Sequence, residues 1–249
     1  MHRALMQRAD PENAGCFRTV PVWIGGSHLG PHQADYVGPP ADSVPDLIGD
    51  LVQFTRRRDL PAMVQIAIAH AQFETIHPFN DGNGRTGRAV IQVLLKHLNI
   101  SNSLMAPVSA GLLSDTQRYF RALDAYRAGD PNEIVKVLSE AALRAVENGR
   151  LLTADLEQIR MDWQQLAVGR AGSAARELLD LLLAQPLITT TRAIELLGRT
   201  AVNTQRAIDT LVDAGVLTQI GQTRRNRIWQ AREVLFALEQ FATRTRRRR

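Results

Sequence analysis

The stretch HPFNDGNGRTGR, residues 77–88, decides how this chain folds and what chemistry it offers. It places three glycines, two arginines, one histidine and one aspartate within twelve residues. Apolar sequence of helical character precedes it in LPAMVQIAIAHAQFETI and follows it in RAVIQVLLKHLNI. A polar, glycine-rich loop between two buried helices predicts a binding site, because a plain turn needs none of these charged groups.

The residues of this loop suit a phosphate-bearing ligand. DGNG can turn several backbone N–H groups toward one face, and the helix that follows adds the positive end of its dipole. Arg85 and Arg88, three residues apart, share one face of the first turn and suit two or three phosphate groups. Asp81 offers an oxygen ligand for Mg²⁺, and His77 can take a proton from an attacking hydroxyl. Together these groups indicate phosphoryl or nucleotidyl transfer. The loop is not a P-loop, since it lacks the Gly-Lys-Ser/Thr ending.

The motif resembles the signature of the Fic (filamentation induced by cAMP) family, His-Pro-Phe-x-Asp/Glu-Gly-Asn-Gly-Arg-x-x-Arg, at every fixed position. AHAQFETIHPF, FRTVPVWIGG with YVGPP, and RYFRALDAYRAGD also resemble bacterial members. The resemblance covers roughly residues 2–243. It implies an all-α fold with a small β-hairpin flap, and an activity that transfers AMP from ATP to a Ser, Thr or Tyr hydroxyl of a target protein.

By this resemblance His77 is the general base and Phe79 anchors the loop in the core. Asp81 is expected to bind Mg²⁺, Arg85 the β-phosphate and Arg88 the γ-phosphate of ATP. The anion-binding backbone is expected at Gly82, Asn83 and Gly84, and the further nucleotide-binding positions are Thr86 and Gly87.

The flap and an aromatic pair complete the implied site. The family's flap, expected at about residues 17–40, places Val22, Trp23, Ile24 and Gly25 where a target segment aligns by strand addition. Tyr119 and Phe120 match a pair that lines the adenine side, with ordinary packing of core aromatics as the open alternative. Arg127 stands where some relatives have Asn near the nucleotide.

The hydrophobic pattern predicts two domains. We expect a Fic domain over 1–165, a boundary in the small, glycine-bearing segment at 166–174, a winged helix-turn-helix domain over 172–243 and a disordered basic tail at 244–249. In the first domain VPVWIGG and ADYVGPP predict the arms of a hairpin, and Ser43 is a predicted helix N-cap. In the second, Gly198 and Gly215 are expected to end two helices.

The charge of the chain supports this division. Its net charge of +5 divides into about −1 over residues 1–170 and +6 from residue 171 onward. The predicted recognition helix and wing offer residues able to reach bases or phosphates, so DNA is one expected partner and protein docking the other. The candidate DNA contacts are Asn203, Thr204, Gln205, Arg206, Arg224, Arg225 and Arg227.

Composition indicates the cellular compartment in which the chain is expected. No run approaches the ~18 apolar residues of a membrane span, and no signal-peptide core is present. Cys16 is the single cysteine, so no intrachain disulfide can form and a reducing cytoplasm is expected. The expected cofactors are ATP and Mg²⁺. A homodimer is left open.

Many Fic proteins carry an inhibitory helix with the pattern Ser/Thr-x-x-x-Glu-Gly/Asn, whose Glu pairs with the second motif arginine, here Arg88. The nearest matches, TADLEQ (153–158) and TRAIEL (191–196), depart from the pattern at their last position. We therefore expect a chain that is not self-inhibited, with a separate inhibitory protein as one potential partner. The competing functions are a DNA-binding regulator that uses the Fic site as a nucleotide sensor, and a Fic enzyme acting with another nucleotide, on phosphate transfer or on AMP removal.

Overall fold

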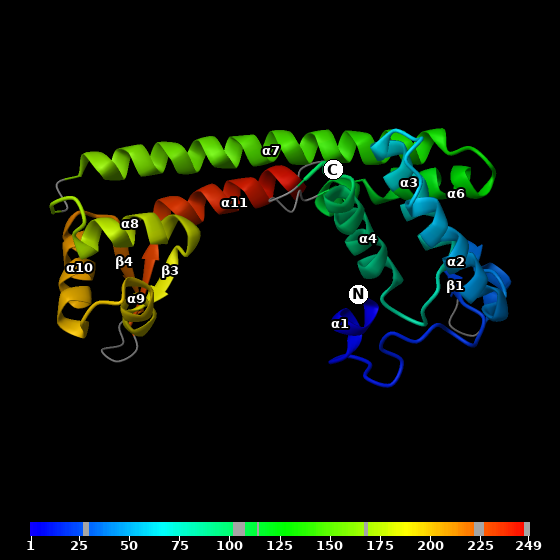
Figure 1. The fold of residues 1–249 in the computed structure, drawn as a ribbon, viewed down its shortest axis with the longest axis horizontal. Helices are drawn as coiled ribbons and strands as arrows, with labels where there is room; N and C mark the ends of the chain where they lie inside the picture. Colours follow the sequence, from blue (N-terminus) through cyan, green and yellow to red (C-terminus); the bar gives the residue numbers. More distant parts are fainter. Residues whose placement is uncertain (27–29, 102–107, 114, 167–168, 222–226, 247–249) are drawn as a thin grey trace. The chain divides into compact units, whose positions relative to one another are not determined.

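The computed structural model describes residues 1–249 except 27–29, 102–107, 114, 167–168, 222–226 and 247–249 (Figure 1). The chain divides into two compact units, Met1–Val146 and a second unit that begins at Glu147. The predicted fold class, mostly helical with a few small antiparallel strands, is confirmed.

The first unit contains seven α-helices, two strands and two short 3₁₀ turns within its described residues. In chain order they are α1 His2–Met6, β1 Trp23–Ile24, η1 Pro31–Gln33, β2 Tyr36–Val37, η2 Ala41–Ser43, α2 Val44–Thr55, α3 Ala62–Ile76, α4 Asn83–His97, α5 Val108–Leu113, α6 Thr116–Arg127 and the beginning of α7 Asn132–Gln165.

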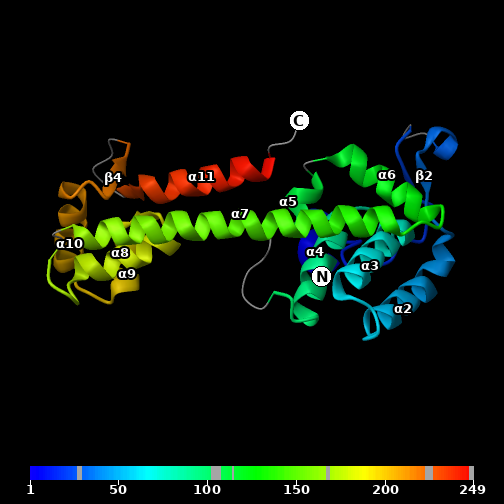
Figure 2. The same cartoon turned by 90° about the horizontal axis from the view of Figure 1, so that it is seen from above.

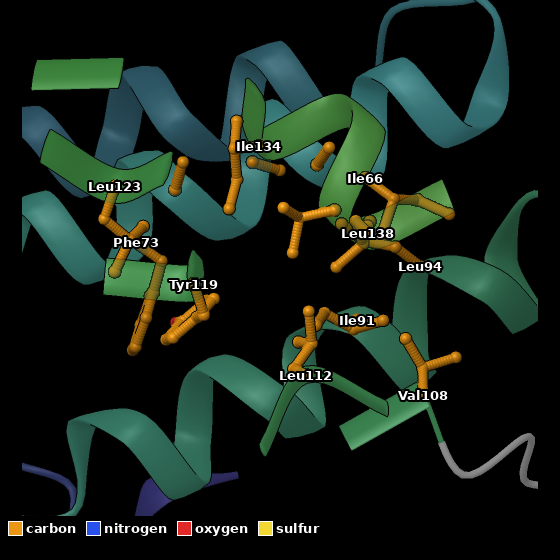
Figure 3. Close-up of a cluster of buried hydrophobic side chains, with 14 of the residues drawn as sticks. Ile66, Phe73, Ile91, Leu94, Val108, Leu112, Tyr119, Leu123, Ile134 and Leu138 are labelled. Carbon is orange, nitrogen blue, oxygen red and sulfur yellow. The ribbon is translucent and has the colours of Figure 1, made fainter. Parts of the chain in front are cut away.

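Helix α3 is the centre of this unit, as its sequence predicts. Its buried residues fall on every side, because α2, α4 and α6 all pack against it. Figure 3 shows Ile66 and Phe73 of α3 among apolar side chains from α4, α5, α6 and α7. This surrounded helix carries the motif loop, residues 77–82, at its C-terminal end.

The predicted hairpin is confirmed as a two-stranded antiparallel sheet. Trp23 pairs with Val37 and Ile24 with Tyr36. Ser43 occupies the predicted N-cap position of α2, but its hydroxyl donates to the carbonyl oxygen of Pro40 at 2.7 Å and accepts no helix N–H. The preceding 3₁₀ turn holds Ser43 in helical geometry, so its side chain cannot reach forward over the first turn of α2.

The second unit holds a three-stranded antiparallel sheet packed with helices. Its elements are the C-terminal part of α7, α8 Ala174–Ala184, β3 Leu187–Thr189, α9 Thr190–Leu197, α10 Ala201–Asp213, β4 Leu217–Ile220, β5 Ile228–Ala231 and α11 Arg232–Arg246, with strand order β3-β5-β4. Gly198 and Gly215 adopt the positive φ values expected at helix ends. Strand β3 is too short to show a pattern in the sequence. The winged helix assignment stays a prediction.

The two compact units meet between Val146 and Glu147, inside α7, whereas the predicted boundary segment is 166–174. Figure 2 shows α7 as one uninterrupted helix. Its C-terminal part joins the second hydrophobic cluster through Trp163, whose indole N–H donates to Glu233 of α11 at 2.6 Å. Helix α7 contributes residues to both hydrophobic clusters. Its apolar pattern continues from one to the other, so the sequence does not show where one cluster ends and the next begins. The domain limits themselves stay predictions.

Residues 244–246, predicted as the start of a disordered basic tail, are helical, and residues 247–249 lie outside the described part of the chain. Helix α11 continues to Arg246, past the predicted start of disorder at residue 244. The guanidinium of Arg244 donates to Asn148 at 2.7 Å and pairs with Asp155 at 3.3 Å, both on α7. Both partners lie about ninety residues earlier in the chain. The sequence therefore shows Arg244 only as one residue of a basic run.

Candidate active site

The motif forms a helix–loop–helix turn between α3 and α4. His77 ends α3 in the left-handed conformation, with φ of 49°. Gly82 precedes α4 with φ of 76°, and a side chain at that position would collide with Met6. The loop therefore returns sharply enough to place the N-terminus of α4 beside the end of α3, which brings the motif residues together.

His77 presents one ring nitrogen to the site. Its Nδ1 lies 3.3 Å from the carbonyl oxygen of Glu74, and no described residue bonds to Nε2. Burial lowers the pKa of His77, an effect that the carbonyl of Glu74 opposes and the charges of Arg18 and Arg127 reinforce. The imidazole is thus held neutral at ordinary pH, with its proton on Nδ1 and Nε2 able to accept another.

Arg18 holds the same turn in place and was missed in the sequence. Its side chain is 2% exposed, and its guanidinium donates to the carbonyl oxygen of His77 at 2.8 Å. Its backbone N–H donates to Pro78 at 2.9 Å. An arginine in FRTV, 59 residues before the motif, gives no sequence signal of this contact.

Asp81 lies two residues before the first residue of α4. The Asp81 carboxylate is exposed: Oδ1 accepts the N–H of Gly82 and Oδ2 lies 3.3 Å from Nη2 of Arg85. Within the described residues no three His, Cys, Asp or Glu side chains gather into a metal site. Asp81 is therefore a single carboxylate able to share a cation with phosphates and water.

Two side chains brace the loop from behind. The amide of Asn83 bonds both backbone groups of Phe79, accepting from its N–H at 2.9 Å and donating to its carbonyl at 2.7 Å. Phe79 is buried and stacks on the imidazole of His2 at 3.6 Å between ring centres. His2 also contacts the carbonyl oxygen of Asp81 at 3.0 Å through Nε2. The side chain of Asn83 is thus occupied in the loop, so only its backbone is available to an anion.

Arg88 is the cation of the site with no hydrogen bond or ion pair to the described residues, and it is only partly buried. The charge of Arg88 acts on the carboxyl of Glu74, which is buried and whose Oε1 has no hydrogen-bond partner in the described part of the chain. Burial raises the pKa of Glu74 to about 7, although Arg88 and Arg127 oppose this rise. The guanidinium of Arg88 is therefore available for a ligand.

Comparison with known proteins agrees with this geometry. Residues 1–95 match the model of the Fic/DOC family. The N-terminal part of the chain is thus similar to a Fic domain. The chain is similar to "Protein adenylyltransferase fic-1" of Caenorhabditis elegans, 29% identical over 147 residues, and of Caenorhabditis briggsae, 30% identical over 150 residues. Each match covers 59% of this chain and 27% of the relative.

One further curated protein and one solved structure are also similar to this chain. "Protein adenylyltransferase Fic" of Drosophila erecta is 27% identical over 168 residues, which is 64% of this chain and 30% of that protein. The crystal structure of a Fic family protein from Desulfovibrio desulfuricans G20 aligns with a TM-score of 0.54 and 22% identity, over 92% of this chain and 66% of that one. The chain thus spans less than a third of the length of these curated relatives, and the structural match concerns the fold.

Behind the Fic motif, a buried contact supports the first turn of α4. Nδ1 of His70 lies 3.1 Å from the carbonyl oxygen of Gly87, and Nε2 lies 2.9 Å from the hydroxyl of Tyr119. A carbonyl can only accept, so His70 carries its proton on Nδ1 and Tyr119 donates to Nε2. Thr86 is buried and donates to the carbonyl of Gly82 at 2.9 Å. Thr86 and Gly87 therefore shape the loop from inside.

The aromatic pair predicted beside adenine is split between two environments. Tyr119 is part of the core, whereas Phe120 is 53% exposed, with ring centres 5.5 Å apart. Arg127 lies over the ring of Tyr36 at 3.6 Å and donates to Asp124 at 2.9 Å. Of these residues, Phe120 offers the free surface that a nucleobase could contact.

The flap of the Fic domain lies against the end of α3. Val22, Trp23 and Ile24 are partly buried and Gly25 is exposed. Gly25 and Gly26 both have positive φ, and a side chain on Gly25 would overlap Asp35. The hydroxyl of Tyr36 donates to the carbonyl oxygen of Thr75 at 2.6 Å. The sheet is thereby tied to α3 two residues before His77.

Helix α10 places only some of its candidate DNA contacts outward. Thr204 is fully buried, so its prediction as a base contact was wrong: it lies on the inward face of the helix with Ala207 and Ile208. Asn203 and Arg206 are exposed, and both line a hollow of about 350 Å³ beside the start of α8. Gln205 donates to Asp209 at 2.8 Å, and the guanidinium of Arg227 lies 5.6 Å from the ring centre of Trp229. The last two candidates, Arg224 and Arg225, fall outside the described residues.

No helix within the described part of the chain is long and apolar enough to cross a membrane.

Proposed function

We propose that this protein transfers AMP from ATP to a hydroxyl side chain of a target protein. The observation that carries the proposal is the pairing of an accepting His77 Nε2 with an anion-binding helix start whose Arg88 has no partner among the described residues. Relatives similar over about 60% of the chain bear the name protein adenylyltransferase, which supports this reaction class.

The triphosphate is expected at the N-terminus of α4. Backbone N–H groups of the first turn and the helix dipole favour negative charge there. Arg85 and Arg88 lie on this turn and would hold the β- and γ-phosphates. Arg85 lies close to Asp81, and Arg88 has no partner among the residues that the structure describes. Phe120 would contact the adenine through its exposed face.

The donors present fit a magnesium ion shared with the phosphates. Asp81 supplies one exposed carboxylate, and Mg²⁺ commonly takes its other ligands from phosphate oxygens and water. When bound, the ion would neutralise charge on the leaving pyrophosphate. Asp81 would hold it, and its contact with Arg85 would orient that carboxylate.

The transfer step needs a base and an aligned acceptor. The hydroxyl of the target attacks the α-phosphorus of ATP, and its proton passes to Nε2 of His77. The bond between the α-phosphorus and the bridging oxygen breaks, and pyrophosphate leaves with that electron pair. The target segment would align along β1, where a strand edge can pair with an extended peptide.

Labelled nucleotide tests the proposal directly. The protein is incubated with Mg²⁺, cell lysate and ATP labelled at either the α- or the γ-phosphate, and intact mass is measured. We expect label from the α-phosphate and an added AMP on the protein itself or on a target. Label from the γ-phosphate would indicate phosphate transfer, and unlabelled proteins with confirmed ATP binding would reject transfer altogether.

DNA binding through α10 is the second candidate function, because exposed Asn203 and Arg206 lie on one face of that helix. A gel shift of random duplex DNA that weakens steeply with salt would favour it. The Arg206→Ala variant should then lose most of that shift.

A further inference from the structure

Arg18 joins two parts of the Fic domain that the reaction needs to hold together. Its guanidinium donates to carbonyl oxygens at the end of α3, those of Ile76 at 3.3 Å and His77 at 2.8 Å. It also donates to carbonyl oxygens on both sides of the flap, those of Val20 at 3.1 Å and Pro39 at 2.6 Å. The guanidinium of Arg18 thus bonds both the C-terminal end of α3, where His77 lies, and the two ends of the flap.

The chemistry of this contact favours a fixed geometry. A guanidinium directs its five N–H groups in one plane, so four acceptors around it can shift little relative to one another. All four acceptors are neutral carbonyls, and two of them belong to the negative end of the α3 dipole. The side chain is 2% exposed, and among described residues it pairs with no carboxylate. A buried charge retained in this way is costly unless every bond is made.

A second, uncharged tether supports the same connection. The hydroxyl of Tyr36, in β2, donates to Thr75 at 2.6 Å, and Arg127 covers the ring of Tyr36. The flap is therefore held to α3 at two places, by Arg18 at its open end and by Tyr36 in β2.

We propose that Arg18 is a positioning residue that sets the distance between a target segment aligned on the flap and the base His77. This proposal rests on the proposed AMP transfer. A protein hydroxyl reaches His77 only if the flap and the end of α3 keep their spacing. A water molecule that attacks the same nucleotide needs the base but not the flap, and its attack gives free AMP and pyrophosphate.

The test compares AMP transfer to a protein hydroxyl with AMP transfer to water. In the full chain, Arg18→Gln and Arg18→Lys are compared with wild type and with Arg8→Gln, an exposed arginine of the same segment. Label from α-labelled ATP is measured both on protein and as free AMP, with nucleotide affinity and thermal unfolding recorded for each variant. We expect Arg18→Gln to lower the ratio of protein labelling to free AMP at least fivefold, with ATP Kd changed less than twofold. Arg18→Lys should lie between, and Arg8→Gln should match wild type.

An equal fall of both products, with an unchanged ratio, would overturn the proposal and leave Arg18 a folding residue. A second measurement does not depend on transfer: NMR titration of His77. Because Arg18 and Arg127 both depress the pKa of His77, removing the charge of Arg18 should raise that pKa, whereas Arg18→Lys should change it less. An unmoved His77 pKa in folded Arg18→Gln would also contradict the contact. A wild type that labels nothing, with this shift present, would instead reject the proposed function.

Discussion

Nδ1 of His77 lies 3.3 Å from the carbonyl oxygen of Glu74, three residues earlier in the chain. A carbonyl accepts only, so the imidazole proton sits on Nδ1, which leaves Nε2 to act as the proposed base. His77→Ala should therefore reduce AMP transfer by at least ~10²-fold, the usual share of a general base, and leave ATP affinity within twofold. Transfer is measured with α-labelled ATP and affinity by calorimetry. Near wild-type labelling by this variant would refute the assignment of the base.

Arg88 should act on nucleotide binding. Because its guanidinium has no partner among the described residues, Arg88→Ala removes a charged contact without leaving another group unpaired. We expect at least ~10-fold weaker binding of ATP, which corresponds to about 1.4 kcal/mol, and a smaller loss for AMP. Arg150→Ala, an exposed arginine on α7, is the matched control. Equal losses for ATP and AMP would argue against a role at the terminal phosphates.

The turn after α3 and the start of α4 could be predicted from the sequence, because neighbouring residues determine both. Twelve contiguous residues specify the turn and the helix start, and α3 is buried on all sides, as its composition requires. The contacts that complete the site come from distant positions. Arg18 reaches His77 across 59 residues, and Tyr119 reaches His70 across 49. No periodicity encodes such pairings.

The errors have a related cause. Thr204 is polar but lies on the face of α10 that includes Ala207 and Ile208, so the helical phase decides its position. Arg244 belongs to a basic run but finds Asn148 and Asp155 on α7. In each case residue type suggested exposure, while the packing partner, which the sequence does not name, determined the outcome.

Glu74 should make stability depend on pH. Burial raises the pKa of its carboxyl from 4.5 to about 7, so the folded protein keeps a proton that the unfolded chain releases above pH 4.5. The stabilising contribution is complete below pH 4.5 and is lost as pH rises through 7. Glu74→Gln removes this dependence, and its stability relative to wild type should rise by on the order of 2 kcal/mol between pH 5 and pH 8.

Denaturant unfolding of both proteins at several pH values checks this expectation. His70 titrates in the opposite sense, because burial lowers its pKa to about 4 and stability is lost as pH falls from 6.5 toward 4. That contribution is common to both proteins and cancels in their difference. A difference that stays constant from pH 5 to pH 8 would show that Glu74 is ionised throughout the range.

Gly87 should tolerate no side chain, because α3 and α4 approach closely there. A methyl carbon at this position would lie 2.2 Å from Oε1 of Glu74 and 3.2 Å from Cδ1 of Phe73. Gly87→Ala is expected to cost roughly 1–3 kcal/mol of stability by overpacking. Gly49→Ala in α2, where nothing lies within 4 Å, should instead stabilise by up to about 1 kcal/mol through helix propensity. Thermal unfolding of the two variants gives the comparison, and a Gly87→Ala protein as stable as Gly49→Ala would mean that α3 and α4 are not packed this closely.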